Sequence, residues 1–280
     1  MLRREDIRIR DPFIVTDREA GCYYMYGTTA MLAGSIAASS SFRAFRSEDL
    51  EHFEGPYTVF DGEKAGFWAD RDYWAPEVHR YRGKYYMFAS FKAEGRCRGT
   101  QILASDTPLG TFAPISEGPQ TPADWECLDG TLLVQDGVPY LVFSHEWLQI
   151  YDGEICAVRL SEDLTRPVGE PFTLFRASDN PAVLSHSVRD GHKCYVTDGP
   201  FFVPGEQGLR LLWSSMAVNG YAILEATAPA LTGPWEHKPP RYDFDGGHCM
   251  TFTDLSGKRR LSFHAPNTAG LERAAFADFA

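Results

Sequence analysis

Short apolar runs rich in Tyr, Phe, Val and Ile recur along the whole chain, and Gly, Pro, Asp and Ser separate them. Runs of this length between turn residues predict β-strands. Clear examples are the segments Lys84 to Ser90, Tyr140 to Ser144 and Leu209 to Ser214. The sequence shows no amphipathic helix of useful length, so the pattern predicts an all-β protein.

The predicted strands form a unit that recurs along the chain. Each unit opens with an acidic or polar residue beside Pro or Gly, continues in a short apolar strand, turns, and returns in an aromatic strand. The units open at Asp11, Pro76, Asp129, Asp198 and Gly247. A spacing of roughly 50 to 70 residues is that of one four-stranded propeller blade with variable loops.

We therefore predict a single five-bladed β-propeller that spans residues 1–280. The predicted blades cover roughly residues 8–60, 72–118, 127–176, 196–238 and 243–280. A β-sandwich or two stacked β domains would also give short strands with regular turns. The repeat favours the propeller over both alternatives.

A propeller would bring the opening residues of the repeats together, because the first strand of each blade lines the central channel. The polar residues at these positions are Asp11, Glu77, Asp129, Asp198 and His248. Carboxylates crowded in one pocket repel one another, which raises the pKa of at least one and leaves others ionised. Glycoside hydrolysis needs such a division between an acid and a base. Asp beside Gly or Pro is also a common turn residue, but four acids at equivalent points favour a functional site.

Composition and charge narrow the kinds of partner. The 280 residues are 44% hydrophobic, and the formal net charge of -11 argues against a nucleic-acid partner, which would need a basic face. A small or neutral ligand such as an oligosaccharide is expected instead. No apolar run approaches the roughly 20 residues that span a bilayer, so no membrane partner is expected. The segment Met1 to Arg10 is too charged for a signal peptide, which predicts a cytoplasmic protein.

The cysteines lie far apart and form no Cys-x-x-Cys pair. This spacing favours buried reduced thiols over a disulfide framework or a zinc site. The six residues are Cys22, Cys97, Cys127, Cys156, Cys194 and Cys249. The sequence makes no prediction of the oligomeric state.

Four short motifs give the chain a resemblance to glycoside hydrolase family 43. They are Ile9-Arg10-Asp11-Pro12, Tyr73-Trp74-Ala75-Pro76-Glu77-Val78, Leu128-Asp129-Gly130, and Asp198-Gly199-Pro200 ahead of a Leu-Leu-Trp-Ser-Ser strand. Members of that family are five-bladed propellers that act as α-L-arabinofuranosidases, β-xylosidases, arabinanases and galactanases. The resemblance implies an inverting glycosidase that releases terminal arabinofuranosyl or xylosyl units, or galactosyl units, from oligosaccharides. It implies no required cofactor.

The same resemblance assigns roles to the carboxylates. Asp11 would be the general base, Asp129 would orient and tune the acid, and Asp198 would stand at the position of the general acid. The family usually carries Glu at that position, and the Asp198 side chain is one methylene shorter. Glu146 and Glu126 are the alternative acids.

Two other functions compete with hydrolysis of this kind. A propeller that binds carbohydrate without cleaving it could use the same acids as hydrogen-bond acceptors, and the shorter Asp198 keeps this alternative open. An invertase-like retaining fructosidase would share the pair Glu126-Cys127 and the tripeptide Arg10-Asp11-Pro12. Such enzymes carry a separate Asn-Asp-Pro motif, which this chain lacks.

Two further residues are expected close to the acids. The resemblance implies that His248 lies near the channel axis and holds either a water molecule or a cation such as calcium, the cation directly or through water. Arg10 could lower the pKa of the neighbouring Asp11. Alternation along a strand nevertheless predicts that Arg10 points to the outside of the ring.

Aromatic and acidic residues are expected to bind the sugar. Rings at the channel mouth can stack on sugar faces, and carboxylates can accept hydrogen bonds from hydroxyl groups. The predicted contacts are Trp74, Phe91, Trp147 and Phe201 among the aromatic residues, and Glu77 and Glu146 among the acids.

Overall fold

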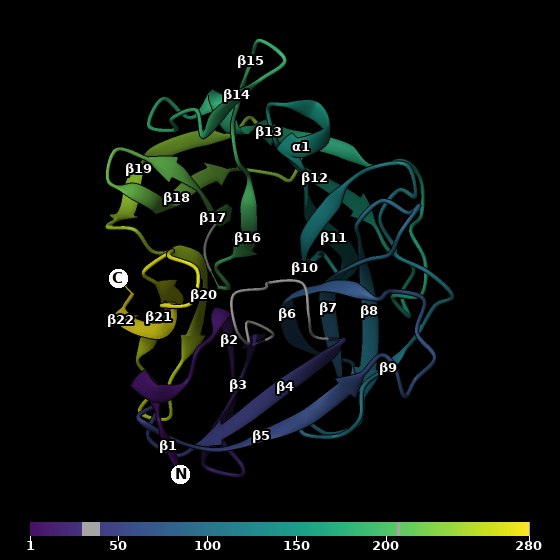
Figure 1. The fold of residues 1–280 in the computed structure, drawn as a ribbon, viewed down its shortest axis with the longest axis vertical. Helices are drawn as coiled ribbons and strands as arrows, with labels where there is room; N and C mark the ends of the chain where they lie inside the picture. Colours follow the sequence, from purple (N-terminus) through teal and green to yellow (C-terminus); the bar gives the residue numbers. More distant parts are fainter. Residues whose placement is uncertain (30–39, 206–207, 280) are drawn as a thin grey trace.

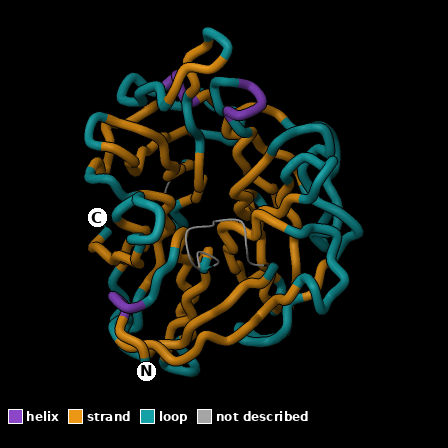
Figure 2. The backbone as a smooth tube through the Cα atoms, viewed as in Figure 1, coloured by secondary structure: helices purple, strands orange, loops and turns teal. Residues whose placement is uncertain are grey.

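Five β-sheets surround a central axis in a ring (Figure 1). The computed structural model describes residues 1–29, 40–205 and 208–279. Strands make up nearly all of the regular structure, as the tube in Figure 2 shows. Apart from a short strand at the outer edge of the first sheet, the strand nearest the axis comes first in each sheet, and the later strands follow outwards in chain order. The predicted five-bladed β-propeller is confirmed.

Blades 1 and 2 follow this order from the axis outwards. Blade 1 consists of β2 (Arg10–Asp17), β3 (Cys22–Thr28), β4 (Ser41–Ser47) and β5 (His52–Asp61), with the short β1 (Leu2–Arg3) on its outer edge. Blade 2 consists of β6 (Arg71–Tyr81), β7 (Lys84–Lys92), β8 (Gly99–Ser105) and β9 (Ala113–Pro114).

Blades 3 to 5 complete the ring. Blade 3 consists of β10 (Cys127–Gln135), β11 (Val138–His145), β12 (Glu154–Arg159) and β13 (Phe172–Arg176), and the hairpin of β14 (Ser187–Arg189) and β15 (His192–Cys194) follows it. Blade 4 consists of β16 (Asp198–Phe202), β17 (Leu209–Ala217), β18 (Gly220–Ala228) and β19 (Glu236–Asp243). Blade 5 has β20 (Gly247–Thr253), β21 (Arg259–Ala265) and β22 (Arg273–Asp278). β19 thus continues beyond the predicted end of blade 4 at residue 238.

Helical structure in the described part of the chain is limited to three short segments. They are the 3-10 helices η1 (Arg4–Asp6) and η2 (Ala177–Asp179) and the α-helix α1 (Trp147–Ile150), which follows β11. Within residues 1–29, 40–205 and 208–279, no helix is long and apolar enough to cross a membrane.

The ring closes between blades 1 and 5 through the segment that precedes β2. After β1 has paired with β5, the chain crosses to blade 5. There Arg8 forms a bridge with Arg273 of β22, and the Ile9 N–H donates to the Glu272 carbonyl at 3.3 Å. This closing segment therefore belongs to the first and the last blade, and backbone hydrogen bonds hold it to both.

Aromatic side chains fill the space between blades 1 and 2. Phe91 is fully buried there, with ring centroids 4.8 Å from Phe67, 5.0 Å from Tyr73 and 5.7 Å from Phe42. Edge-to-face pairs of this kind stabilise a core beyond their buried area. Phe91 is therefore a core residue, and the prediction that it stacks on sugar at the channel mouth is wrong.

The cysteines agree with the sequence-based interpretation. All six are free thiols, and five of them are buried while Cys97 is partly exposed.

Every innermost strand carries a β-bulge near the axis. Its pairing with the second strand shifts at the same place in all five blades, as between Arg10 and Phe13 in blade 1. The residue after the last regular pair has a positive φ in each case: Asp11 (53°), Ala75 (45°), Asp129 (56°), Gly199 (51°) and His248 (50°). Bulges re-aim side chains, so the bulge residue and the residue before it can both face the axis.

Candidate active site

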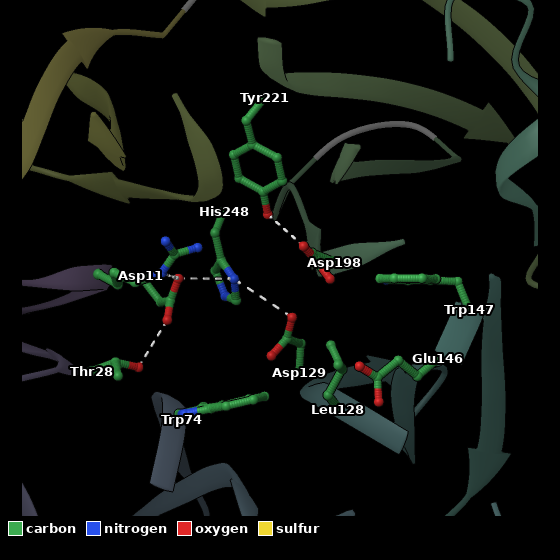
Figure 3. A pocket seen from close by; sticks show the side chains of 11 residues that line it. Asp11, Thr28, Trp74, Leu128, Asp129, Glu146, Trp147, Asp198, Tyr221 and His248 are labelled. Atoms are coloured by element: carbon green, nitrogen blue, oxygen red, sulfur yellow. Dashed lines mark hydrogen bonds and ion pairs between the residues drawn. The ribbon is translucent and has the colours of Figure 1, made fainter. Parts of the chain in front are cut away.

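A cavity of about 240 Å³ lies on the axis beside these bulges (Figure 3). Most of its lining comes from bulge residues and from the residues that precede them. The remainder comes from β3, from β18 and from the start of α1. The lining residues are Arg10, Asp11, Thr28, Trp74, Leu128, Asp129, Glu146, Trp147, Asp198, Tyr221 and His248.

The bulges correct the alignment of the repeats made from the sequence. Ala75 and Gly199 occupy the positions in blades 2 and 4 that Asp11 and Asp129 occupy in blades 1 and 3. Asp198 lies one residue earlier, at the position before the bulge. Its carboxyl group therefore enters the cavity from a different strand position than the other two aspartates.

Glu77 and Phe201 do not line this cavity. Both come after the bulge residue of their strand. Glu77 is 3% exposed, and its carboxylate lies 3.0 Å from Nε2 of His79. Phe201 packs edge to face on Phe13, with ring centroids 6.1 Å apart. The structure therefore does not bring these two predicted substrate contacts to the site.

Arg10 lines the cavity, so the prediction that it points outwards is wrong. The bulge at Asp11 breaks the alternation of the strand, which is why the two adjacent residues share one side. Nη1 of Arg10 donates to Oε1 of the fully buried Glu272 at 3.1 Å, and its Nε lies 4.0 Å from Oδ1 of Asp11. Arg10 thus brings a permanent positive charge to the cavity wall.

Asp11 is held as a carboxylate. Thr28 Oγ1 donates to its Oδ2 at 2.8 Å, and Nδ1 of His248 lies 3.3 Å from its Oδ1. Burial raises the pKa of Asp11, but the charges of His248 and Arg10 help to outweigh burial and hold that pKa well below its usual range. A carboxylate that stays ionised is suited to accept a proton.

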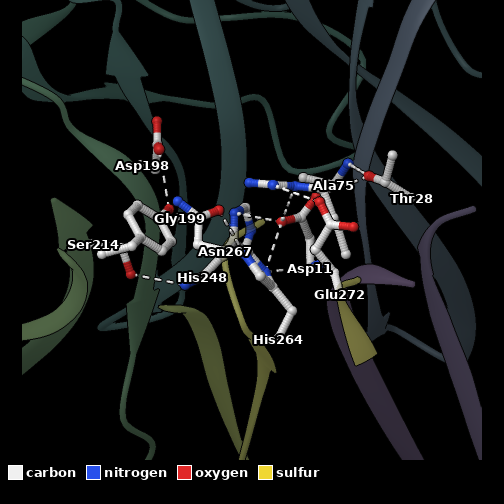
Figure 4. Close-up of polar contacts among 12 residues, drawn as sticks. Asp11, Thr28, Ala75, Asp198, Gly199, Ser214, His248, His264, Asn267 and Glu272 are labelled. Carbon is white, nitrogen blue, oxygen red and sulfur yellow. Dashed lines mark hydrogen bonds and ion pairs between the residues drawn. The ribbon is translucent and has the colours of Figure 1, made fainter. Parts of the chain in front are cut away.

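His264 supports Asp11 from behind as a neutral imidazole (Figure 4). The Asp11 backbone N–H donates to Nδ1 of His264 at 3.3 Å, so this nitrogen is the acceptor. The ring proton is then on Nε2, which lies 3.2 Å from Oδ1 of Asn267. Burial lowers the pKa of His264, in agreement with the neutral form.

His248 projects between Asp11 and Asp129. Its Nδ1 lies 3.3 Å from Oδ1 of Asp11 and 3.6 Å from Oδ2 of Asp129. Burial lowers the pKa of His248, but the carboxylates of Asp11 and Asp129 outweigh it and raise that pKa. Glycine is required at position 199, because a Cβ there would lie 2.8 Å from Cγ of the His248 ring.

The described residues around His248 form no preformed site for the predicted calcium ion. Calcium takes about six to eight oxygen ligands, and Nδ1 of His248 faces two carboxylates. Among the residues that the structure describes, no group of three or more His, Cys, Asp or Glu is placed to hold a metal. The cation at His248 stays a prediction, and no step below passes through it.

Asp129 and Asp198 each accept one hydrogen bond from a fixed donor. The Gly199 N–H donates to Oδ2 of Asp129 at 3.0 Å, and the Tyr221 hydroxyl donates to Oδ2 of Asp198 at 3.0 Å. Burial raises the pKa of Asp129 to about 7 despite His248, and the neighbouring carboxylates add to the shift. Burial also raises the pKa of Asp198. These two carboxyl groups therefore retain a proton between them near neutral pH.

Hydrogen bonds link the bulges of neighbouring blades around the axis. Four bulge N–H groups donate to a side chain on the second strand of the preceding blade: Asp11 to His264, Ala75 to Thr28, Asp129 to Ser90 and His248 to Ser214. The N–H of Gly199 donates to the Asp129 carboxylate instead. Ser144 holds the equivalent acceptor position opposite Leu128, and its buried hydroxyl has no hydrogen-bond partner among the described residues.

Ser90 accepts a bulge hydrogen bond and Ser144, among the described residues, does not. This difference gives a prediction for both serines. Ser90→Ala is expected to lower the free energy of unfolding by about 1–3 kcal/mol, because it leaves the buried Asp129 N–H unpaired. Ser144→Ala removes a hydroxyl that makes no hydrogen bond, so a change within about 0.5 kcal/mol is expected. Urea unfolding followed by circular dichroism measures both changes. Equal losses in the two variants would contradict the bonding pattern.

Glu146 forms a buried ion pair beside the cavity. Nη1 of Arg98 contacts Oε2 of Glu146, and Nη2 of Arg98 donates to Oδ2 of Asp72 at 2.8 Å. The guanidinium carbon lies 4.3 Å from the centroid of the Trp74 ring. Burial raises the pKa of Glu146 to about 7, although Arg98 opposes the shift. Arg98 thus contacts Glu146, Asp72 and the Trp74 ring, and it holds these three side chains together beside the cavity.

Removal of this guanidinium is expected to destabilise the fold. Arg98→Leu leaves Glu146 buried without its cation, so the free energy of unfolding at pH 7 should fall by about 3–5 kcal/mol. Arg82→Leu is the matched control, because the side chains of the Arg82–Glu162 pair are 56% and 77% exposed. That variant should lose no more than about 1 kcal/mol. Similar losses of unfolding free energy in both variants would contradict the prediction.

Two tryptophans form apolar walls of the cavity. Trp74 precedes the bulge of blade 2, and Trp147 is the first residue of α1. They lie on either side of Leu128 and Glu146 (Figure 3). The structure therefore places both rings where a sugar in the cavity would meet them.

Four residues of the cavity were missed by the sequence analysis: Arg10, Thr28, Leu128 and Tyr221. Arg10 was assigned to the wrong face, because a bulge cannot be read from apolar alternation. Thr28 and Tyr221 lie on β3 and β18, outside the first strands that the repeat singled out. Gly246 and Gly247 precede His248, and this pair is the sequence feature that could have pointed to a bulky neighbour. A Cβ at Gly247 would lie 2.4 Å from the ring of Tyr221.

A ring of five blades around a small polar cavity, with one ionised carboxylate and two carboxyl groups that share a proton, is the arrangement expected of a propeller glycoside hydrolase. The chain belongs to glycosyl hydrolases family 43, whose model matches residues 6–278. The family match leaves the invertase-like interpretation without support.

Three similar proteins are named as an endo-arabinase, an endo-arabinanase and an exo-arabinofuranosidase. An endo-arabinase structure from Bacteroides thetaiotaomicron VPI-5482 superposes with a TM-score of 0.90 at 38% identity, and the match covers 100% of this chain and 97% of that one. The extracellular endo-α-(1→5)-L-arabinanase 1 of Bacillus subtilis is 20% identical over 85% of this chain and 71% of its own length. The extracellular exo-α-(1→5)-L-arabinofuranosidase ArbA of Cellvibrio japonicus is 21% identical over 91% of this chain and 73% of its own length.

Proposed function

We propose that this protein removes terminal α-L-arabinofuranosyl units from oligosaccharides with inversion at the anomeric carbon. The cavity carries the proposal, because about 240 Å³ is below the roughly 300–1,000 Å³ of pockets for drug-sized ligands and suits one sugar ring. The names of the similar arabinanases and of the exo-acting arabinofuranosidase favour arabinose. Xylosyl and galactosyl units are the alternatives within the same family.

The three aspartates divide the reaction between them. Asp11, with its low pKa, acts as the general base and takes a proton from water as the water oxygen attacks the anomeric carbon. Asp198, with its raised pKa, acts as the general acid and gives its proton to the departing glycosidic oxygen. Asp129 accepts from the Gly199 N–H next to Asp198, so it orients the acid. The two carboxyl groups share a proton, and the charge on either one disfavours ionisation of the other.

Two glutamates are weaker candidates for the acid. Glu126 accepts from Lys92 Nζ at 2.6 and 2.7 Å, and this bond helps to overcome burial and lower its pKa. Glu146 is paired with the permanently charged Arg98. Asp198 instead meets a neutral phenol, so a proton on its carboxyl group breaks no ion pair.

Product analysis tests this proposal directly. The enzyme is mixed with p-nitrophenyl α-L-arabinofuranoside, β-xyloside and β-galactoside, and with linear arabino-oligosaccharides. The arabinosides should be hydrolysed fastest, and proton NMR during the first minutes should show the anomer opposite to that of the substrate. Retained configuration would overturn the mechanism, and binding without turnover of any substrate would indicate a carbohydrate-binding protein.

A further inference from the structure

Tyr221 fills a position that a first-strand side chain fills in the other blades. The residue before the bulge is Arg10, Trp74, Leu128 or Asp198 in blades 1 to 4, and each of these side chains lines the cavity. In blade 5 this residue is Gly247. A Cβ there would lie 2.4 Å from Cε1 of Tyr221, so the phenol ring takes the place of the missing side chain.

The surroundings of Tyr221 fix its ring and its hydroxyl group. The residue is 2% exposed, and its ring stacks on His264 with centroids 5.7 Å apart and an interplanar angle of 20°. Its hydroxyl donates to Oδ2 of Asp198 at 3.0 Å (Figure 3). Burial and the Asp198 charge raise the pKa of Tyr221 well above its usual value, so the hydroxyl remains a donor.

This donor favours one oxygen of Asp198 as the carrier of a proton. Oδ2 accepts from the phenol, and the unprotonated oxygen of a carboxyl group is the better acceptor, so the proton of the neutral acid is favoured on Oδ1. Asp has only two side-chain torsions, and one hydrogen bond from a rigid ring is enough to fix both of them. The phenol thereby holds a carboxyl group that is one methylene shorter than glutamate.

We propose that Tyr221 is a positioning residue that fixes the rotamer of Asp198 and reserves Oδ1 for the proton that is transferred. The inference rests on the proposed role of Asp198 as the general acid. Tyr221 touches neither the leaving oxygen nor the water in this scheme; it acts through the carboxyl group that it binds.

Other charges also face the Asp198 carboxyl group, and all of them remain when only the hydroxyl is removed. His248 and Arg10 favour its ionised form, whereas Asp11 and the neighbouring Asp129 and Glu146 disfavour it. The Tyr221 hydrogen bond acts in the same direction as the cations. Loss of the hydroxyl alone should therefore raise the pKa of Asp198.

Tyr221→Phe tests the proposal, with Tyr242→Phe on the adjacent strand β19 as the matched control. The variant should lower kcat on arabino-oligosaccharides by about 10- to 100-fold, because part of the general-acid contribution is lost. KM should not change. Hydrolysis of p-nitrophenyl α-L-arabinofuranoside should fall less than about threefold, since a good leaving group needs little protonation. Equal losses on both substrates, or no loss on either, would overturn the proposal.

A second variant and a second measurement make the test independent of turnover. Gly247→Ala displaces the ring and should reproduce the loss on oligosaccharides. Carbon-13 NMR titration of the Asp198 carboxyl, assigned with Asp198→Asn, should show a higher pKa in Tyr221→Phe than in the unmodified protein. An unchanged pKa contradicts the positioning role, whether or not arabinosides are substrates. A raised pKa in a protein that hydrolyses no glycoside contradicts only the proposed function.

Discussion

Asp198→Asn is expected to abolish cleavage of arabino-oligosaccharides, with kcat lower by about 10²- to 10⁴-fold. An amide has nearly the shape of the carboxyl group and can still accept from Tyr221, but it has no proton to transfer. A p-nitrophenyl leaving group departs without protonation, so that substrate should lose far less activity. Measurement of kcat and KM for both substrates gives the ratio that identifies the general acid.

Glu146→Gln is the matched comparison for this experiment. Glu146 lines the same cavity and has a pKa raised to about 7. The amide removes charge without removing volume, and its effect should be similar on both substrates. If Glu146→Gln shows the loss that depends on the leaving group and Asp198→Asn does not, Glu146 is the general acid.

Asp11→Asn should reduce kcat by a similar factor, about 10²- to 10⁴-fold, but equally for both substrates. The base acts on the attacking water, which is the same whatever group departs. An asparagine amide also cannot hold the charge of His248, so the pKa of His248 should fall. Parallel kinetics with oligosaccharide and p-nitrophenyl substrates measure the effect, and a loss confined to oligosaccharides would remove Asp11 from the role of base.

The repeat was sufficient to predict the fold because each blade buries its strands in the same way. The same repeat placed Asp11, Asp129 and Asp198 near one axis, as the structure shows. Turn-like motifs mark the inner ends of strands in any propeller, and a carboxylate there has few places to point except into the channel. This part of the site is local in sequence.

The remainder of the site depends on geometry that local sequence does not encode. The bulge moves Glu77 out of the cavity and brings Arg10 into it. Arg98 reaches Glu146 from a different blade, 48 positions away along the chain. Tyr221 lies on a third strand, where an aromatic residue is ordinarily a packing residue. Such contacts form only when the blades assemble into the ring, so the local sequence does not predict them.

The closing segment also determines how this enzyme would lose activity. Ile9, whose N–H is bonded to blade 5, is only two residues from Asp11. Segments that few backbone hydrogen bonds hold in place open locally before the rest of a domain. Opening of this seam would carry Asp11 away from His248 and the other aspartates while the remaining blades stay folded. Heat inactivation should therefore precede the melting of the sheets. Catalytic activity should be lost at a lower temperature than the circular dichroism signal of the strands.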